Sequence, residues 1–186
     1  MDNQIFSALI PDASATTRTQ IAKTLRAFGE PALRFAAENG SRVRPLGRGE
    51  RYAEASPALV RLGIDVDAWP APPAGLFVVE ERTVYLRSRS AMTIGHEFGH
   101  VLDCALGGGV YRSGIDPAIR AAFSAARQFV TPYAASGIDE YFAECVRAWV
   151  GANDPASAWP AVSRERLEHL DPAMHAIIKG IFDGFV

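Results

Sequence analysis

A short segment, His96-Glu97-Phe98-Gly99-His100, contains the residue types of a metal-dependent hydrolase. Residues four apart in a helix share a face, so both imidazoles could bind one metal ion. Glu97 would be turned by about 100° from His96 and would lie beside the metal, where a base acts on metal-bound water. Glycine costs a helix interior about 1 kcal/mol relative to alanine, so Gly99 predicts close packing of another segment. The alternative is an ordinary helix with two unrelated histidines.

A catalytic zinc site would need a third protein ligand, with the fourth position left to water. A later histidine at the spacing His-x-x-Gly-x-x-His is excluded, because Asp103 and Leu106 occupy those positions. The remaining histidines, His169 and His175, are six residues apart and would lie on different faces of a helix. We therefore expect them to be unconnected with the site.

Two glutamates in residues 136–150 could complete the site. Glu140 and Glu144 are four residues apart, among the apolar side chains of Ile138, Tyr141, Phe142, Val146 and Trp149. Burying an unpaired carboxylate costs on the order of several kcal/mol, so acids beside such a surface need partners. A zinc ion would satisfy one glutamate as a ligand, and the free N–H of a ligand histidine would satisfy the other. The alternative is a solvent-facing pair at the margin of the helix.

Capping signals place both groups on helices. Ser90 is a suitable N-cap for a helix that runs to about Leu106, where a run of three glycines ends it. Ser136 with Asp139 predicts the start of a second helix, which ends near Val150 before Gly151. Two β-rich runs within residues 76–88 predict a hairpin that turns at Glu81-Arg82.

The rest of the chain predicts an α+β fold: a small mixed lobe with a β-hairpin or short sheet up to about residue 89, then a mainly helical lobe. We expect residues 1–70 to form an N-terminal helical segment of unknown role and residues 71–186 to form the site-bearing domain, within one compact unit. Residues 41–51 are expected to be a loop or a short edge strand. Further helices are expected at 14–28, 31–39 and 57–62, from Pro117 to about Phe129, and after Ser163 and Asp171.

Composition excludes several classes of protein. The 186 residues are 48% hydrophobic, enough for a core without disulfides or metal, and a formal net charge of −2 argues against a nucleic-acid binder. No segment has the apolar length of a membrane span, and the N-terminus lacks the basic region of a signal peptide. We therefore expect a soluble protein, either cytoplasmic or exported by a non-classical route, with no partner chain to infer. Cys104 and Cys145 are expected to be reduced core thiols rather than a redox link between the two helices.

Residues 96–103, HEFGHVLD, and the pattern Tyr-x6-Glu-x-Phe-Ala-Glu at 133–144 resemble a known family. This family comprises the catalytic domain of anthrax lethal factor and the related bacterial Pro-Pro endopeptidases, which are zinc metallopeptidases of the gluzincin type. The resemblance covers about residues 74–150, and it places the strand-rich segment before the helix where the family has its active-site strand. It implies a zincin-like fold with one Zn²⁺ per chain.

The resemblance also implies a role for each matching residue. His96, His100 and Glu140 would be the zinc ligands, and Glu97 would be the general base and acid. Tyr133 would face the reacting carbonyl, and Glu144 would be the acid behind the ligand histidine. Without the resemblance, the hydroxyl of Tyr133 could donate a hydrogen bond to an oxyanion, or its ring could simply pack on the core.

The sequence thus predicts a zinc-dependent endopeptidase that hydrolyses a protein or peptide by a zinc-activated water. The substrate is expected to add as a strand along Val84, Tyr85, Leu86 and Arg87. The family resemblance also suggests a toxin or effector. One alternative is a regulatory metallopeptidase of the repressor-cleaving type, whose second motif usually has asparagine where this chain has Tyr141. Others are a zinc-stabilised binding module, which the intact Glu97 disfavours, and a helical interaction domain without zinc.

Overall fold

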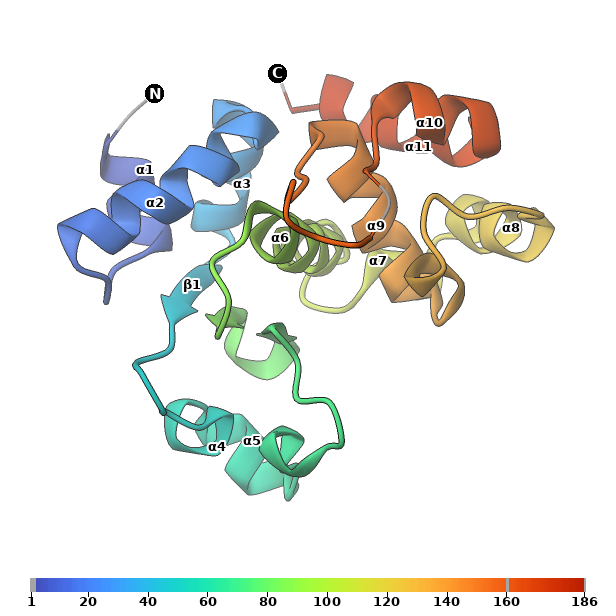
Figure 1. The fold of residues 1–186 in the computed structure, drawn as a ribbon. Helices are drawn as coiled ribbons and strands as arrows, with labels where there is room; N and C mark the ends of the chain where they lie inside the picture. Colours follow the sequence, from blue (N-terminus) through green and yellow to red (C-terminus); the bar gives the residue numbers. More distant parts are fainter. Residues whose placement is uncertain (1–2, 160, 186) are drawn as a thin grey trace.

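The computed structural model describes residues 3–159 and 161–185, which are arranged around one buried helix, α6 (Ala91–Leu106) (Figure 1). On one side of α6 lie α1 (Asn3–Leu9), α2 (Ala15–Leu25), the 3₁₀ turn η1 (Arg26–Phe28) and α3 (Glu30–Glu38). On the other side lie α7 (Arg112–Ile115), α8 (Pro117–Ala125), η4 (Tyr133–Ala135), α9 (Ile138–Val150), α10 (Arg164–Leu170) and α11 (Pro172–Asp183).

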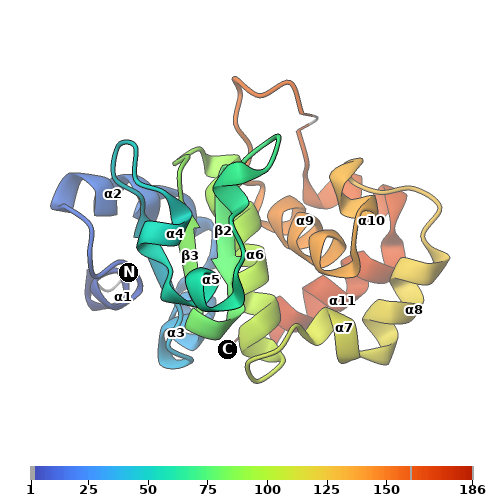
Figure 2. The ribbon, with the colours of Figure 1, turned by 90° about the horizontal axis from the view of Figure 1, so that it is seen from below.

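A three-stranded sheet flanks α6, with the strand order β1-β3-β2. The hairpin strands β2 (Gly75–Val78) and β3 (Thr83–Leu86) are antiparallel, and the turn η3 (Val79–Glu81) joins them as expected. The strand β1 (Arg42–Pro45) pairs with β3 in parallel, so β3 is the central strand. Figure 2 shows β2 next to α6, with α9 on the other side of this helix. The small elements α4 (Tyr52–Ala55), α5 (Pro57–Leu62) and η2 (Val66–Ala68) lie beyond the sheet.

The main core explains why α6 is apolar on nearly every face. From the N-terminal part of the chain, helices α2 and α3 pack against α6. Phe28, in the turn η1 between them, meets Phe98 of α6 edge to face, with the ring centroids 4.8 Å apart. From the C-terminal side, α9 adds Phe142 and Val146 to the same buried cluster. Residues before position 70 therefore help to hold α6 in place. The expected boundary between an N-terminal segment, residues 1–70, and a site-bearing domain, residues 71–186, stays a prediction.

Two local expectations need correction, and one helix was missed. Helix α1 was not expected, although Phe6 and Leu9 are buried in the core, because its seven residues are too short for a clear helical period. Helix α8 ends at Ala125 rather than near Phe129, because Ala126 adopts an extended conformation. Ser136 does not cap α9. Its hydroxyl donates to the Tyr133 carbonyl at 2.7 Å, and Gly137 is the residue before the helix.

Other features agree with the sequence. Ser90 caps α6, and Gly151 ends α9 with a left-handed conformation at φ 65°. Cys104 and Cys145 are both buried and unpaired, as expected of core thiols. Within the described residues, no helix is long and apolar enough to cross a membrane.

Candidate active site

The two histidines of α6 face the same point, as their spacing predicts. The Nε2 atoms of His96 and His100 are 3.2 Å apart, and the rings stand nearly perpendicular at 4.8 Å. Helix α6 begins at Ala91, after the Ser90 hydroxyl accepts a hydrogen bond from the Thr93 N–H. This places the motif in the second and third turns of a well-capped helix, where its backbone is fixed.

Helix α9 brings Glu140 to the histidines. Its Oε2 lies 3.0 Å from the Nε2 of His96 and 3.3 Å from that of His100. The two helices cross almost in backbone contact, because a Cβ atom at Gly99 would lie 2.7 Å from the Cα of Ala143. The mid-helix glycine therefore has the packing role that its cost predicts.

These three side chains fit a zinc ion. A tetrahedral site with bonds of about 2.0–2.1 Å places its ligand atoms about 3.3–3.4 Å apart, close to the separations of 3.0–3.3 Å seen here. Despite these short distances, Glu140 Oε2 is buried and makes no hydrogen bond of good geometry within the described residues. Two imidazoles and one carboxylate are also a typical donor set for catalytic zinc. His96, His100 and Glu140 could therefore hold the metal.

The electrostatics of this cluster favour a cation. Burial disfavours the charged form of His96, but its contacts with Glu140 and Glu144 outweigh burial and raise the pKa of His96 to about 10. Burial also opposes ionisation of Glu140, yet His100 and His96 hold the pKa of its carboxyl well below the usual range. The field that retains a proton on His96 would also stabilise a divalent metal in its place.

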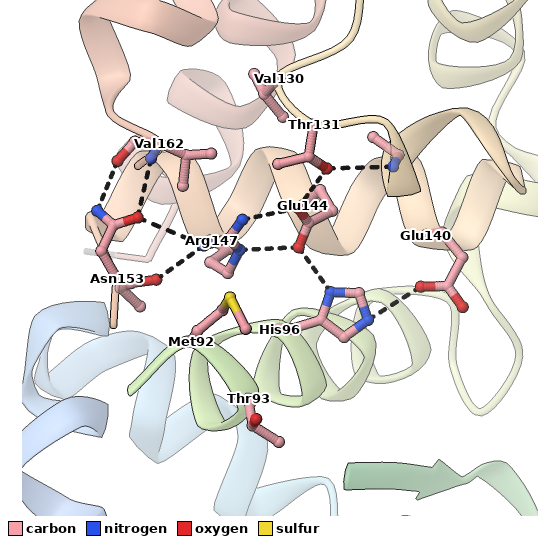
Figure 3. A network of polar contacts seen from close by, with 12 residues as sticks. Met92, Thr93, His96, Val130, Thr131, Glu140, Glu144, Arg147, Asn153 and Val162 are labelled. Atoms are coloured by element: carbon pink, nitrogen blue, oxygen red, sulfur yellow. Dashed lines mark hydrogen bonds and ion pairs between the residues drawn. The ribbon is translucent and has the colours of Figure 1, made fainter. Parts of the chain in front are cut away.

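Glu144 lies directly behind His96 (Figure 3). Its Oε1 is 2.9 Å from the Nδ1 of His96, which orients Nε2 toward Glu140. Arg147 donates to both carboxylate oxygens, each at 2.8 Å, and the Thr131 hydroxyl donates to Oε2 at 2.6 Å. Although burial opposes ionisation, these bonds lower the pKa of Glu144 to about 2. The carboxylate is therefore a fixed, ionised partner for His96, as a histidine that binds a metal would need.

Glu97 lies beside the two histidines on α6, on the side of the helix that meets the edge strand β2. Burial raises the pKa of its carboxyl, and this effect outweighs the charges of His96 and His100, which favour the ionised form. A Cβ atom at Gly75 would lie 2.6 Å from the Cγ of Glu97, so β2 can approach this closely only with glycine there. A buried carboxylate with a raised pKa beside a metal site has the properties of a general base.

Tyr133 lies at the exposed side of the cluster, in η4. Its hydroxyl donates to Glu140 Oε1 at 2.9 Å, and its ring is 5.4 Å from that of His96. Partial burial and the Glu140 carboxylate raise the pKa of Tyr133, which keeps the phenol protonated as a donor. The residue is 44% exposed, so a substrate could reach it.

The sheet topology corrects the expected position of the substrate strand. Val84, Tyr85 and Leu86 are buried in the central strand, which pairs with β1 on one side and β2 on the other. The Arg87 N–H also donates to the Ala74 carbonyl, at 2.9 Å, so no free edge is available there. The hairpin signal could not reveal this, because the second partner, β1, lies about 40 residues earlier. Within the described residues, the strand edge next to α6 belongs to β2.

Sequence reasoning missed three residues of the site. Arg147 follows Glu144 by three positions in a helix, a spacing that could have identified it as a partner. Gly75, at the start of a strand, could have indicated a close approach of the backbone. Thr131 has no comparable signal, because its contact with Glu144 depends on the path of the loop before η4.

We expect zinc to stabilise the fold through His100. At a zinc concentration about 100 times the dissociation constant, the free energy of unfolding should rise by about 2.7 kcal/mol. The His100→Ala variant should show almost none of this gain, whereas His169→Ala, at an exposed position of α10, should keep it. Urea unfolding with and without zinc measures the effect. An equal gain in the His100→Ala variant would refute the ligand assignment.

Comparisons with known proteins bear on the fold. No family model and no curated protein sequence matches the chain. A solved structure that does match is the Pro-Pro endopeptidase PPEP-2 from Paenibacillus alvei, with a TM-score of 0.66 and 17% sequence identity. The match covers 95% of this chain and 99% of that one, so it extends well beyond the segment that carries the sequence resemblance. The predicted α+β fold is confirmed: this chain has the fold of a Pro-Pro endopeptidase.

Proposed function

We propose that this protein is a zinc-dependent endopeptidase. The observation that carries the proposal is the convergence of His96, His100 and Glu140 on one point, with Glu97 beside them on the same helix. The fold similarity to an endopeptidase supports it. A further role as an exported toxin or effector protease rests on the sequence resemblance alone.

The substrate backbone would lie extended along the outer edge of β2, beside Gly75. Zinc, when bound, would polarise the scissile carbonyl and lower the pKa of a water molecule. Glu97 would take a proton from that water and then return it to the leaving amine. Tyr133 would turn its hydroxyl from Glu140 toward the developing oxyanion. Glu144 would keep the His96 ring in place during the reaction.

The test is cleavage of a diverse peptide library by the zinc-loaded protein, with Glu97→Ala as the control. Cuts that only the wild type makes would support the endopeptidase. If no peptide is cut while one zinc is bound per chain, the binding module becomes the better explanation. A protein that binds no zinc at all would contradict both.

Tyr133→Phe should lower kcat by about 100-fold, the effect of removing one oxyanion donor. Zinc affinity and unfolding should change little, because the phenol is half-exposed and is not one of the three converging groups. Steady-state kinetics on a peptide from the library, together with a zinc titration, measures both effects. An unchanged kcat would remove Tyr133 from the mechanism.

A further inference from the structure

The two histidines of α6 have different surroundings. His96 borders a cavity of about 230 Å³, whose walls also include residues 73–75 and the loop that carries Trp159, and its Nδ1 is paired with Glu144 at 2.9 Å. The Nδ1 of His100 is buried and has no hydrogen-bond partner within the described residues. A metal-binding histidine usually donates from its second ring nitrogen to a carboxylate, a carbonyl or water. The orientation of His100 within the protein therefore depends on a different kind of contact.

An aromatic ring packs against His100. The centroid of the Tyr111 ring lies 5.5 Å from that of the imidazole, and the two planes meet at 42°. The same ring lies 6.3 Å from the Phe77 ring of β2, again between centroids. Ring pairs at these separations attract one another. Tyr111 therefore links the imidazole of His100 to the edge strand of the sheet.

We propose that Tyr111 is a positioning residue for His100, whose imidazole it fixes by ring packing, as Glu144 fixes that of His96 by a hydrogen bond. The inference rests on the metal site of the proposed function, and it assigns the support of the second ligand histidine. It concerns the binding of the metal, so it can be tested before any substrate is known.

Two hydrogen bonds anchor the segment that carries Tyr111. Asp103 lies one helical turn after His100 on α6 and is fully buried. Its carboxylate accepts a hydrogen bond from the Ser113 N–H at 2.7 Å and another from the Ser113 hydroxyl at 2.6 Å. Figure 2 shows the chain leaving α6 through a short loop that enters α7, the helix of Ser113, and α7 contacts both α6 and α9. Because Ser113 is two residues from Tyr111, this anchor limits how far the ring can move from His100.

The glycines after α6 turn the chain back toward the helix. Gly108 and Gly109 have φ values of 69° and 109°, which other residues rarely adopt. A Cβ atom at Gly107 would lie 2.0 Å from the Val110 carbonyl oxygen, so only glycine fits there. The position of Tyr111 is therefore set by a tight turn on one side and by the Ser113 anchor on the other.

The Tyr111 ring acts as an uncharged packing group. Burial raises the pKa of Tyr111, and the charges of Asp139 and Asp103 raise it further, so the phenol stays protonated. Loss of the ring would therefore leave the charge of the metal site unchanged and would increase the freedom of the His100 side chain. The contact is made between rings, so a phenylalanine at this position should preserve it.

The zinc affinity of three variants tests the proposal. Tyr111→Leu keeps an apolar side chain but removes the ring, and its affinity should fall by about 10- to 100-fold, the usual effect of losing a group that supports a metal ligand. Tyr111→Phe keeps the ring and should bind zinc like the wild type. Phe182→Leu is the control, because Phe182 is also partly buried and packs on Trp149, away from the site. It should keep the wild-type affinity. Competition with a chelator of known zinc affinity measures all three.

Two spectroscopic measurements distinguish positioning from a general loss of structure. With Co²⁺ in place of zinc, the visible absorption bands report the geometry of the ligands. Tyr111→Leu should shift these bands and Phe182→Leu should not. In the zinc-loaded wild type, nuclear Overhauser effects should connect the ring protons of Tyr111 and His100, a test that needs no variant to fold.

Each other outcome counts against the proposal in a different way. Wild-type zinc affinity in Tyr111→Leu, an equal loss in Phe182→Leu, or no Overhauser effect between the two rings would overturn it and leave the proposed endopeptidase intact. An equal loss in Tyr111→Phe would overturn it too, because the hydroxyl would then be the group that matters. A wild type that binds no zinc would refute the proposed metal site and this inference together.

Discussion

The Glu97→Gln protein should bind zinc like the wild type and hydrolyse peptides at less than about one per cent of the wild-type rate. A positioned general base contributes about 10²- to 10⁴-fold to a reaction of this kind, and an amide cannot take the proton. Glutamine has the shape of glutamate, so it should fit against Gly75 as glutamate does. The substitution also leaves His96, His100 and Glu140 unchanged, so zinc should still bind.

Turnover and the zinc content of the same preparation measure this effect. Glu80→Gln is the matched control, because it removes an exposed carboxylate in η3 and should keep full activity. A Glu97→Gln rate above one per cent of wild type would refute the base assignment. Loss of zinc from that variant would show instead that Glu97 belongs to the metal site.

Arg147→Met should lower the free energy of unfolding of the metal-free protein by about 3–5 kcal/mol, the usual effect of removing one partner of a buried ion pair. Arg147 is 1% exposed and donates to both oxygens of Glu144. Without it, the buried carboxylate keeps only His96 and Thr131 as partners. Because Glu144 orients His96, a proposed zinc ligand, zinc affinity should also fall by about 10- to 100-fold.

Urea unfolding of the double variant Arg147→Met/Glu144→Gln separates the lost charge pair from lost packing. A neutral amide is less costly to bury than an unpaired carboxylate, so the double variant should be more stable than Arg147→Met alone. Arg147→Lys should recover only part of the loss, because an ammonium group cannot match both oxygens at once. If the loss in the double variant equals the sum of the losses in Arg147→Met and Glu144→Gln, the two side chains are not coupled and the charge pair is not the cause.

The parts of the site that follow from local sequence could be predicted. The caps at Ser90 and Gly151 and the four-residue spacings within each helix defined two helices that each present polar groups to one face. The structure brings these faces together at Gly99, where the cost of a mid-helix glycine predicted close packing.

The parts that depend on distant pairing could not be predicted. A hairpin pattern does not tell which strand is central, and the pairing of Val43 with Val84 turned the expected substrate strand into an interior one. The cavity beside His96 and Glu97 likewise forms only where a strand, a helix and a loop meet, and Asn153 helps to hold that loop by a hydrogen bond to Val162, nine residues later. The helical and strand periodicities of a sequence do not show which distant segments contact one another.

The candidate site and the cavity beside it are built from different segments of the chain. The converging side chains and their supports lie on α6 and α9, which touch at Gly99 and Ala143 with no space for a larger residue at position 99. Two walls of the cavity of about 230 Å³ beside His96 and Glu97 come from residues 73–75 and from the loop that carries Trp159, outside both helices. The shape of that cavity can therefore be changed through those two segments without disturbing the contact between α6 and α9. Under the proposed endopeptidase function, exchange of the loop that carries Trp159 would alter which substrates fit and would leave the proposed metal ligands and base in place.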